Sequence, residues 1–183
     1  GVFKISGRKG VGKSFLCSVL EKRLNNNEVV ISFNAKDLGE MSVYEKIGKI
    51  LGISKKATLE NLFEVFSQIY GLGKNIIIIV DDVDFLSLQN WLYLDDMYNY
   101  KNKLRLVLVG GKKISQQIRK NKLVNLAQNM VYKEYLVPFS FTETYNYIKK
   151  LISEHINYKV ELPMTNWAMF ILSFCGQGIA KNI

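Results

Sequence analysis

The residues best suited to chemistry lie close to the amino terminus, in a glycine-rich stretch between an apolar run and a longer helical pattern. Residues 7–14 read Gly-Arg-Lys-Gly-Val-Gly-Lys-Ser and fit the pattern G-x-x-x-x-G-K-S/T completely. Glycine tolerates positive φ, so successive backbone N–H groups can surround a β-phosphate, and the amino end of the next helix adds partial positive charge. The pattern therefore predicts a loop that binds the phosphates of a purine nucleoside triphosphate, with ATP as the expected nucleotide.

Two side chains at the end of this loop have distinct expected roles. Lys13 should reach the β- and γ-phosphates, and the Ser14 hydroxyl should ligate magnesium. The alternative, a glycine-rich turn that binds nothing, is disfavoured because the strand, loop and helix patterns agree. The predicted nucleotide-binding residues of this segment are Gly7, Arg8, Lys9, Gly10, Val11, Gly12, Lys13, Ser14 and Phe15.

Two adjacent carboxylates follow the most apolar run of the chain. Residues 76–80 are four isoleucines and a valine, as expected of a central strand buried on both faces, and Asp81 and Asp82 come next. Neighbouring carboxylates repel each other unless a cation lies between them. We expect Asp81 to hold magnesium, usually through water, and Asp82 to orient and deprotonate the water that attacks the γ-phosphate. Asp84 is expected to shape the following turn instead.

Strand-like runs alternate with helical patterns through most of the chain, and these elements must position the two motifs. Alternation of this kind predicts an α/β P-loop NTPase fold with a central parallel sheet flanked by helices. The expected strands are residues 2–6, 29–34, 75–80, 104–109 and 132–136. The expected helices are residues 13–25, 42–51, 59–72, 89–98 and 115–120.

The chain changes character after Pro138, because only helical patterns follow, at residues 142–152 and 165–174. We therefore expect residues 1–137 to form the nucleotide-binding core and residues 138–183 to begin a small helical lid. Since the sequence starts within a strand pattern and stops within a helical one, we expect it to be a fragment of a longer protein.

Composition limits the possible classes of protein. The chain has 183 residues, 48% of them hydrophobic, which suits one compact core. Cys17 and Cys175 show no C-x-x-C spacing, which argues against disulfide and zinc sites; we assign both, with His155, to structure. No apolar run approaches the ~20 residues that a bilayer crossing needs, so we expect a soluble, cytoplasmic domain. The alternative is a domain tethered to the inner face of a membrane by parts outside this chain.

The formal net charge of +9 favours contact with polyanions such as double-stranded DNA or an acidic membrane surface. The alternative is a compositional bias toward lysine without a partner. The densest cluster follows the fourth expected strand and could equally be a solvated helix face; it contains Lys112, Lys113, Arg119, Lys120 and Lys122.

Further segments complete a family resemblance. They are residues 42–47 leading to 51–53, residues 106–110, residues 123–135, residues 136–140 with the helix after them, and residues 176–183. With the two motifs, these segments make the sequence similar to AAA+ ATPases of the ExeA and TniB type, which include secretion-associated ATPases and regulators of DNA transposition. The resemblance implies a proline linker into a lid and a sensor 2 helix in which Lys181 contacts nucleotide.

The chain departs from this family at four positions. Asp82 is one methylene shorter than the usual glutamate, Gly111 stands where a polar sensor 1 residue is common, and residues 126–130 lack the arginine of a trans-acting finger. Lys181 replaces the preferred sensor 2 arginine, which keeps the charge but not the bidentate geometry. These departures favour ATP binding over fast hydrolysis.

Two functions remain open. The first is a slow magnesium-dependent ATPase that assembles with neighbours in a ring or filament and remodels or regulates a DNA or secretion complex. The second is a non-hydrolysing, ATP-gated switch or scaffold. Arg105 or Arg119 could supply the missing finger from another position. Transposition-type relatives imply double-stranded DNA as partner, and secretion-type relatives imply a membrane-complex protein.

Overall fold

The computed structural model describes residues 1–24, 28–53, 57–100 and 104–155. Its chain divides into two compact units, one with Gly1–Ser6 and Lys13–Tyr135, the other with Gly7–Gly12 and the chain from Leu136 onward. Lys181, Cys175 and the helix expected at residues 165–174 lie outside the described residues. The boundary expected at residue 137 stays a prediction.

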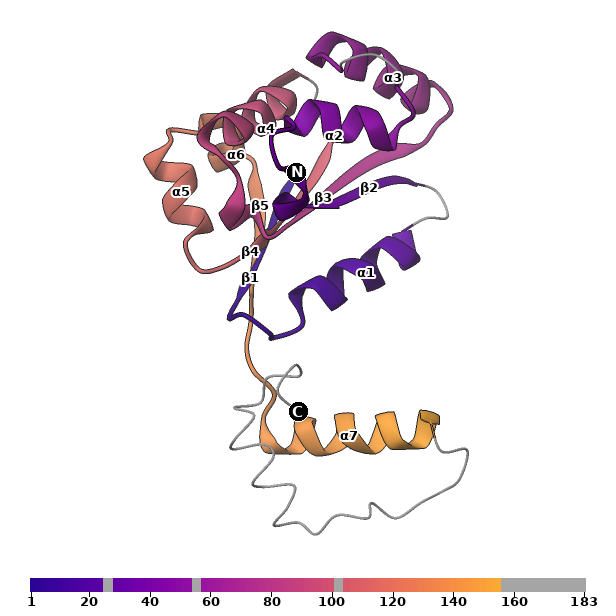
Figure 1. Ribbon diagram of the computed structural model, residues 1–183, viewed down its shortest axis with the longest axis vertical. Coiled ribbons are helices and arrows are strands. Elements are labelled where there is room, and N and C mark those ends of the chain that lie inside the picture. Colours follow the sequence, from indigo (N-terminus) through magenta and orange to yellow (C-terminus); the bar gives the residue numbers. More distant parts are fainter. Residues whose placement is uncertain (25–27, 54–56, 101–103, 156–183) are drawn as a thin grey trace. The chain divides into compact units, whose positions relative to one another are not determined.

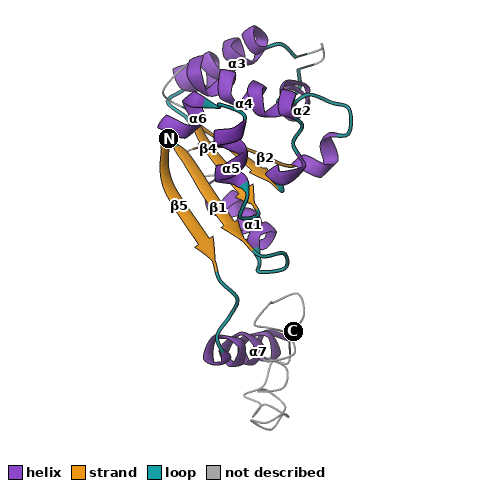
Figure 2. Cartoon of the chain, turned by 90° about the vertical axis from the view of Figure 1, so that its left-hand side faces the viewer, coloured by secondary structure: helices purple, strands orange, loops and turns teal. Residues whose placement is uncertain are grey.

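A five-stranded parallel sheet is the framework of the first unit, with its strands in the order β2-β3-β4-β1-β5. Figure 2 shows β1 and β5 running side by side in the same direction. The strands are β1 (Val2–Gly7), β2 (Glu28–Asn34), β3 (Asn75–Asp81), β4 (Arg105–Gly110) and β5 (Met130–Leu136). The predicted fold class is therefore confirmed, and all five expected strands are present.

Helices cover both faces of this sheet (Figure 1). Helix α1 packs against β2, β3 and β4 on one face, while α2, α3 and α4 gather on the other. The helices are α1 (Lys13–Leu24), α2 (Val43–Ile50), α3 (Leu59–Gly71), α4 (Leu88–Tyr100), α5 (Ile114–Lys120), α6 (Val124–Gln128) and α7 (Phe141–His155). Two short 3₁₀ helices, η1 (Ala35–Leu38) and η2 (Val83–Phe85), and helix α6 had no counterpart in the sequence prediction.

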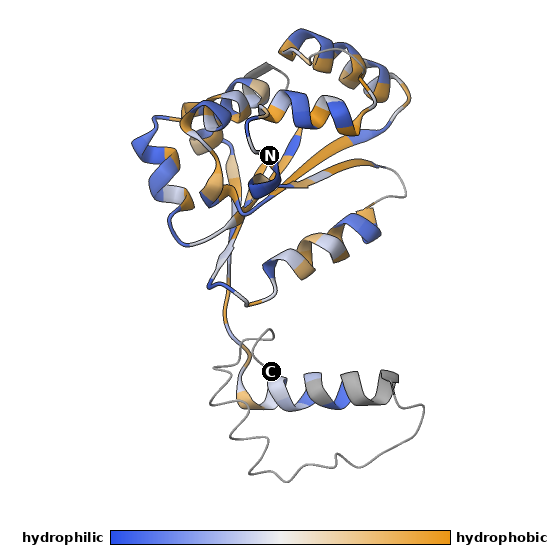
Figure 3. Ribbon diagram, in the orientation of Figure 1, coloured by the Kyte–Doolittle hydropathy of each residue, from blue (hydrophilic) through white to orange (hydrophobic). Residues whose placement is uncertain are grey.

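The core explains why β3 lies inside the sheet, between β2 and β4. Ile76 through Val80 are each 4% exposed or less, because both faces of the strand are covered. Trp91, Leu94 and Met97 of α4 add large buried side chains to one side. Figure 3 shows the hydrophobic colour concentrated along the strands and the hydrophilic colour on the outer helix faces. A strand buried in this way holds its carboxyl end, and the aspartates there, in a fixed place.

Local capping signals start the helices after β2. Ser42 accepts a hydrogen bond from the backbone N–H of Glu45, whose side chain accepts from the Ser42 N–H, which forms a capping box for α2. The Thr58 hydroxyl similarly caps α3. These caps separate α2 and α3 from the preceding polar turns.

Two expectations from composition concern the described part of the chain. Among the described residues, no helix combines the length and apolar composition that crossing a bilayer requires. Cys17 is a free, buried thiol in α1, and burial with the charge of Asp81 raises its pKa to about 12. A thiol with so high a pKa is a poor nucleophile, which fits its assignment to structure.

Candidate functional site

The glycine-rich loop has the backbone conformations that its sequence predicts. Gly10 and Gly12 have φ angles of 85° and 97°, in the region that side chains with a Cβ rarely adopt. At Gly7 a Cβ atom would lie 2.9 Å from the Leu136 carbonyl oxygen and 2.8 Å from Val11 Cγ1, so only glycine fits. The backbone geometry of the loop therefore requires glycine at positions 7, 10 and 12.

The chain leaves the loop directly into the first turn of α1. Lys13 and Ser14 are the first two helical residues, and Phe15 is 73% exposed. The first turn of α1 contains Lys13 and no acidic residue, and Lys22 and Arg23 lie in the last turn. This distribution leaves the partial positive charge at the amino end of the helix available to an anion.

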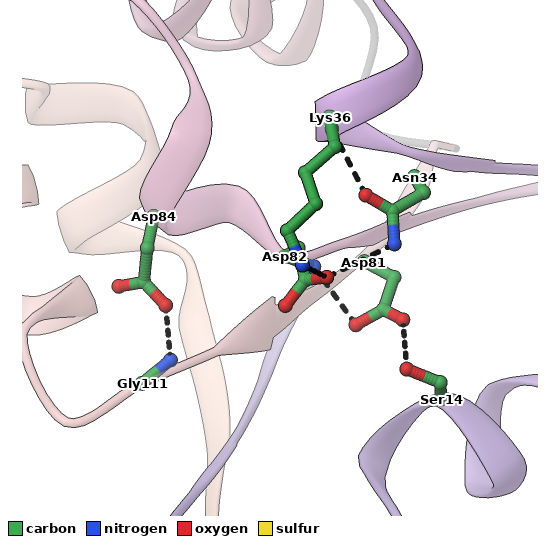
Figure 4. A network of polar contacts seen from close by, with 7 residues as sticks. All are labelled: Ser14, Asn34, Lys36, Asp81, Asp82, Asp84 and Gly111. Atoms are coloured by element: carbon green, nitrogen blue, oxygen red, sulfur yellow. Dashed lines mark hydrogen bonds and ion pairs between the residues drawn. The ribbon is translucent and has the colours of Figure 1, made fainter. Parts of the chain in front are cut away.

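Ser14 and Asp81, which are 67 residues apart in sequence, meet in the structure (Figure 4). The Ser14 hydroxyl donates a hydrogen bond of 2.5 Å to Asp81 Oδ2. The other oxygen of the carboxylate, Oδ1, accepts from the backbone N–H of Asp82 at 2.8 Å. Asp81 is only 6% exposed. The structure therefore brings together the two residues predicted to hold magnesium and fixes both oxygens of the carboxylate.

Asp82 has a different environment although it is the next residue. Its φ and ψ of 52° and 40° are left-handed, a conformation uncommon for residues other than glycine. Its Oδ2 accepts from Asn34 Nδ2 at 3.0 Å and from Lys36 Nζ at 2.5 Å (Figure 4). Burial opposes ionisation of this carboxyl, but the hydrogen bonds from Lys36 and Asn34 and the charges of Lys36 and Lys13 lower its pKa below the ordinary value. Asp82 is therefore ionised near neutral pH and held by side chains of this chain.

Asn34 and Lys36 are the functional residues that the sequence analysis missed. Asn34 ends β2 and lies beside Asp81 in the parallel register. The Asn34 side chain also accepts a hydrogen bond from the Lys36 backbone N–H, which caps the start of η1. The turn at this point brings the Lys36 side chain back toward Asp82. Lys36 Nζ also lies 4.6 Å from the centre of the Phe85 ring, a cation–π contact. A polar residue ending the strand beside β3 was the available signal, since parallel strands end at the same edge.

Asp84 has the structural role expected of it. Its Oδ2 accepts from the backbone N–H of Gly111, which links the turn after β3 to the end of β4 (Figure 4). A Cβ atom at Gly110 or Gly111 would lie 2.8 Å or 3.0 Å from the same oxygen. The two glycines therefore make room for the Asp84 carboxylate, which gives a reason for the absence of a sensor side chain at Gly111.

The arginines considered as fingers lie apart from this network. Arg105 begins β4, at the amino end of the sheet, and its Nη1 pairs with Glu28 Oε1 at 3.1 Å. Arg119 is an exposed residue of α5 whose Nε donates to the Ser115 carbonyl oxygen at 3.4 Å. The Asn129 side chain donates to the Asn125 carbonyl oxygen. Neither Arg105 nor Arg119 forms a hydrogen bond or ion pair with Asp81 or Asp82.

The fold and the two motifs agree with comparison to known families. Residues 1–118 match the AAA domain family, and the chain therefore belongs to that family. This confirms the resemblance to AAA+ P-loop ATPases at the level of the family; the comparisons do not select the ExeA and TniB type. No curated protein matches the sequence significantly.

Solved structures with the same fold include proteins of Aeropyrum pernix and Pyrobaculum aerophilum. The ORC2 protein of Aeropyrum pernix in its ADP form has a TM-score of 0.71 at 15% identity, with 99% of this chain and 53% of that one covered. Cdc6p from Pyrobaculum aerophilum has a TM-score of 0.66 at 13% identity, with coverage of 94% and 47%. The A. pernix ORC1 protein in complex with DNA has a TM-score of 0.60 at 15% identity, with coverage of 84% and 44%. The chain spans about half the length of these relatives. At identities this low, the similarity shows a shared fold alone.

Proposed function

We propose that this chain binds ATP with magnesium at Gly7–Gly12 and the first turn of α1, and hydrolyses it slowly. The observation that carries the proposal is the hydrogen bond between Ser14 and Asp81. In a P-loop NTPase, a serine of this loop and an aspartate at a strand end act on the same metal ion. Their hydrogen bond here supports the assignment of both residues to one metal ion.

The oxygen ligands present fit magnesium. Magnesium prefers oxygen ligands, keeps several waters, and is usually bound by one or two carboxylates together with substrate phosphates. Within the described residues no cluster of three His, Cys, Asp or Glu side chains that could hold a metal ion is present. Ser14 and Asp81 would hold the ion, which supplies charge neutralisation for the β- and γ-phosphates.

Slow turnover follows from the groups around Asp82. A general base must be free to contact the attacking water, but the Asp82 carboxylate is tied to Lys36 and Asn34. Gly111 offers no side chain, and the segment at residues 126–130 offers no cation. A trans-acting arginine is worth roughly 10³–10⁵ in rate, so a chain without one should bind ATP well and hydrolyse it poorly. We propose that neighbouring copies in a ring or filament supply what is missing.

DNA is the partner that we favour for this assembly. The ORC1 relative was solved in complex with DNA, and this chain carries a net charge of +9. A basic domain gains affinity for a polyanion such as duplex DNA by releasing counterions. We propose that ATP binding regulates a complex on double-stranded DNA; a protein of a secretion complex is the alternative partner.

The hold on Asp82 also favours a second candidate function, a non-hydrolysing switch gated by ATP. In that function Asp82 would stay paired with Lys36, and ATP binding alone would order the partner surface. The two candidates differ in one observable, because only the ATPase releases phosphate in proportion to time.

The nucleotide site is tested by calorimetric titration of ATP, ADP and AMP into the chain, with and without magnesium. Because the loop and Lys13 should contact the β- and γ-phosphates, we expect affinity to fall at least tenfold from ADP to AMP. Magnesium should strengthen the binding of ATP. Equal affinity for all three nucleotides would contradict the proposal.

A further inference from the structure

A group of cations lies at the β5 edge of the sheet, away from the aspartates that end β3. Between residues 104 and 135 the chain has seven Lys or Arg residues and a single acidic residue, Glu134. Basic residues therefore outnumber acidic ones seven to one in this segment. The basic residues are Arg105, Lys112, Lys113, Arg119, Lys120, Lys122 and Lys133.

Four cations gather around Ser115 and Tyr135, and we call this group the basic face. It consists of Lys4 of β1, Lys112 in the turn before α5, Arg119 of α5 and Lys133 of β5. Lys4 Nζ donates to Ser115 Oγ at 2.9 Å, and Arg119 Nε donates to the Ser115 carbonyl oxygen at 3.4 Å. Lys112 Nζ lies 5.0 Å from the centre of the Tyr135 ring. Tyr135 and Lys133 are two residues apart on one strand and so face the same side of the sheet.

The cations of this face are held by neutral groups. No ion pair between described residues reaches Lys4, Lys112, Arg119 or Lys133. The one nearby carboxylate, Glu134, points to the other side of β5 and accepts from the Tyr132 hydroxyl at 2.8 Å. Burial and the charge of Lys133 lower the pKa of the Lys4 ammonium. Mutual repulsion without a carboxylate favours binding of an external anion.

We propose that the basic face binds the phosphate backbone of double-stranded DNA. This inference rests on the DNA partner proposed above, and it names the surface that contacts it. Helix α5 has seven residues and is about 10 Å long, which corresponds to about three phosphate steps along one strand of B-DNA. Lys112 lies in the turn just before this helix and Arg119 in its last turn, so the two cations are near opposite ends of the helix, as contact with successive phosphates requires.

Other polyanions fit this face less well. A membrane-binding helix inserts apolar side chains, but Ile114 and Ile118 of α5 are 2% exposed or less and belong to the core. Single-stranded nucleic acid requires aromatic rings free to stack on bases, but the half-buried Tyr135 ring is in contact with Lys112. Contact with phosphates alone, without reading of bases, is what this surface can provide.

The test compares two triple variants of the 183-residue chain with equal change in net charge. The first carries Lys112→Glu, Arg119→Glu and Lys133→Glu. The control carries Lys22→Glu, Lys49→Glu and Lys74→Glu, three lysines that are exposed on other elements of the same unit. Binding to a short fluorescent duplex is measured over a range of salt, and ATP affinity and thermal unfolding are measured on the same samples. If the first variant does not fold, the same three residues are changed to Gln.

We expect the basic-face variant to lose at least tenfold in DNA affinity relative to the control. The slope of log K against log salt should be smaller by about 2.7, because roughly 0.9 is lost for each of three phosphate contacts. ATP affinity should be equal in both, so failure at the DNA step is distinguishable from failure of the ATP site. Equal loss in the two variants would overturn the proposal in favour of diffuse charge. Two results with the unmodified chain at low salt would also overturn it. One is binding to phosphatidylserine vesicles but not to the duplex, and the other is binding to neither.

Discussion

The carboxyl ends of β2 and β3 and the basic face differ in how their charges are balanced. At the strand ends, Asp81 is bonded to Ser14, and Asp82 to Asn34 and Lys36. On the basic face, Lys4 and Arg119 are bonded only to the neutral oxygens of Ser115. In the first region, partners within the chain hold the carboxylates. In the second region, the partners of these cations are neutral, so an external anion would lower the repulsion between them. The predictions below test this difference.

The largest effect is expected at Lys13. Lys13→Ala should weaken ATP binding at least tenfold, because backbone N–H groups cannot replace a full charge at the β- and γ-phosphates. Calorimetry of ATP binding measures this. Lys22→Ala, in the exposed last turn of the same helix, is the matched control and should bind ATP like the parent. Unchanged affinity in a folded Lys13→Ala protein would count against the whole site.

The next effect concerns magnesium. Asp81→Ala should bind ATP with little enhancement by magnesium, because the ion loses its protein carboxylate while the loop still contacts the phosphates. Asp84→Asn is the control, since Asp84 accepts from Gly111 and takes no part in the Ser14 contact. ATP titrations with and without magnesium give the ratio for each protein. If Asp81→Ala kept the enhancement of the parent, Asp81 would not be the metal-side residue.

The sequence predicted well which elements carry Lys13 and Asp81, because the patterns around them are local. A glycine motif, an apolar strand and two carboxylates are contiguous patterns, and the strand and helix ranges around them agree with the structure to within a few residues. The partners of Asp82 were missed for the opposite reason. Asn34 and Lys36 reach it only because β2 lies beside β3 and η1 turns the chain back. The sequence of a single segment does not indicate which strands lie beside it in the sheet.

The basic face shows the same limit. The cluster at residues 112–122 is visible in the sequence, but Lys4 and Lys133 join it only because β1 and β5 are neighbours in the sheet. Short elements were missed as well: α6 has five residues and η2 three, too few for a helical period to be recognised. Lys181 lies outside the described residues, so its role at the nucleotide stays a prediction.

A smaller effect is expected when the hold on Asp82 is released. Lys36→Met removes the ion pair but keeps an apolar side chain beside Phe85, so Asn34 alone still holds the Asp82 carboxylate and the attacking water can compete for it more easily. Phosphate release at saturating ATP should rise by about threefold, an effect near 0.6 kcal/mol in the barrier. Lys46→Met on α2 provides a control with the same change of charge. A fall in rate would show that Lys36 assists catalysis.

The smallest effect is a pH dependence of stability. The folded pKa of Asp82 is depressed, so its contribution is fully present above the unfolded value of about 3.9 and is lost as pH falls through the folded value. The pair with Lys36 is partly exposed, with side-chain exposures of 47% and 23%, so its contribution to stability is small. The free energy of urea unfolding should differ between the parent and Asp82→Asn by a constant amount from pH 7 to 5. Below about pH 4 the advantage of the parent should decrease. A difference independent of pH down to 2.5 would show that the ionised carboxylate is not stabilised by folding.

Steady-state phosphate release over a wide range of protein concentration tests the central claim most directly, namely that this chain binds ATP but depends on neighbours for its turnover. At saturating ATP and magnesium, the dilute chain should turn over at about 10⁻² per second or less, as P-loop proteins without an arginine finger in trans do. Specific activity should then rise with protein concentration as copies assemble. A fast rate that stays constant down to the dilute monomer would contradict the account.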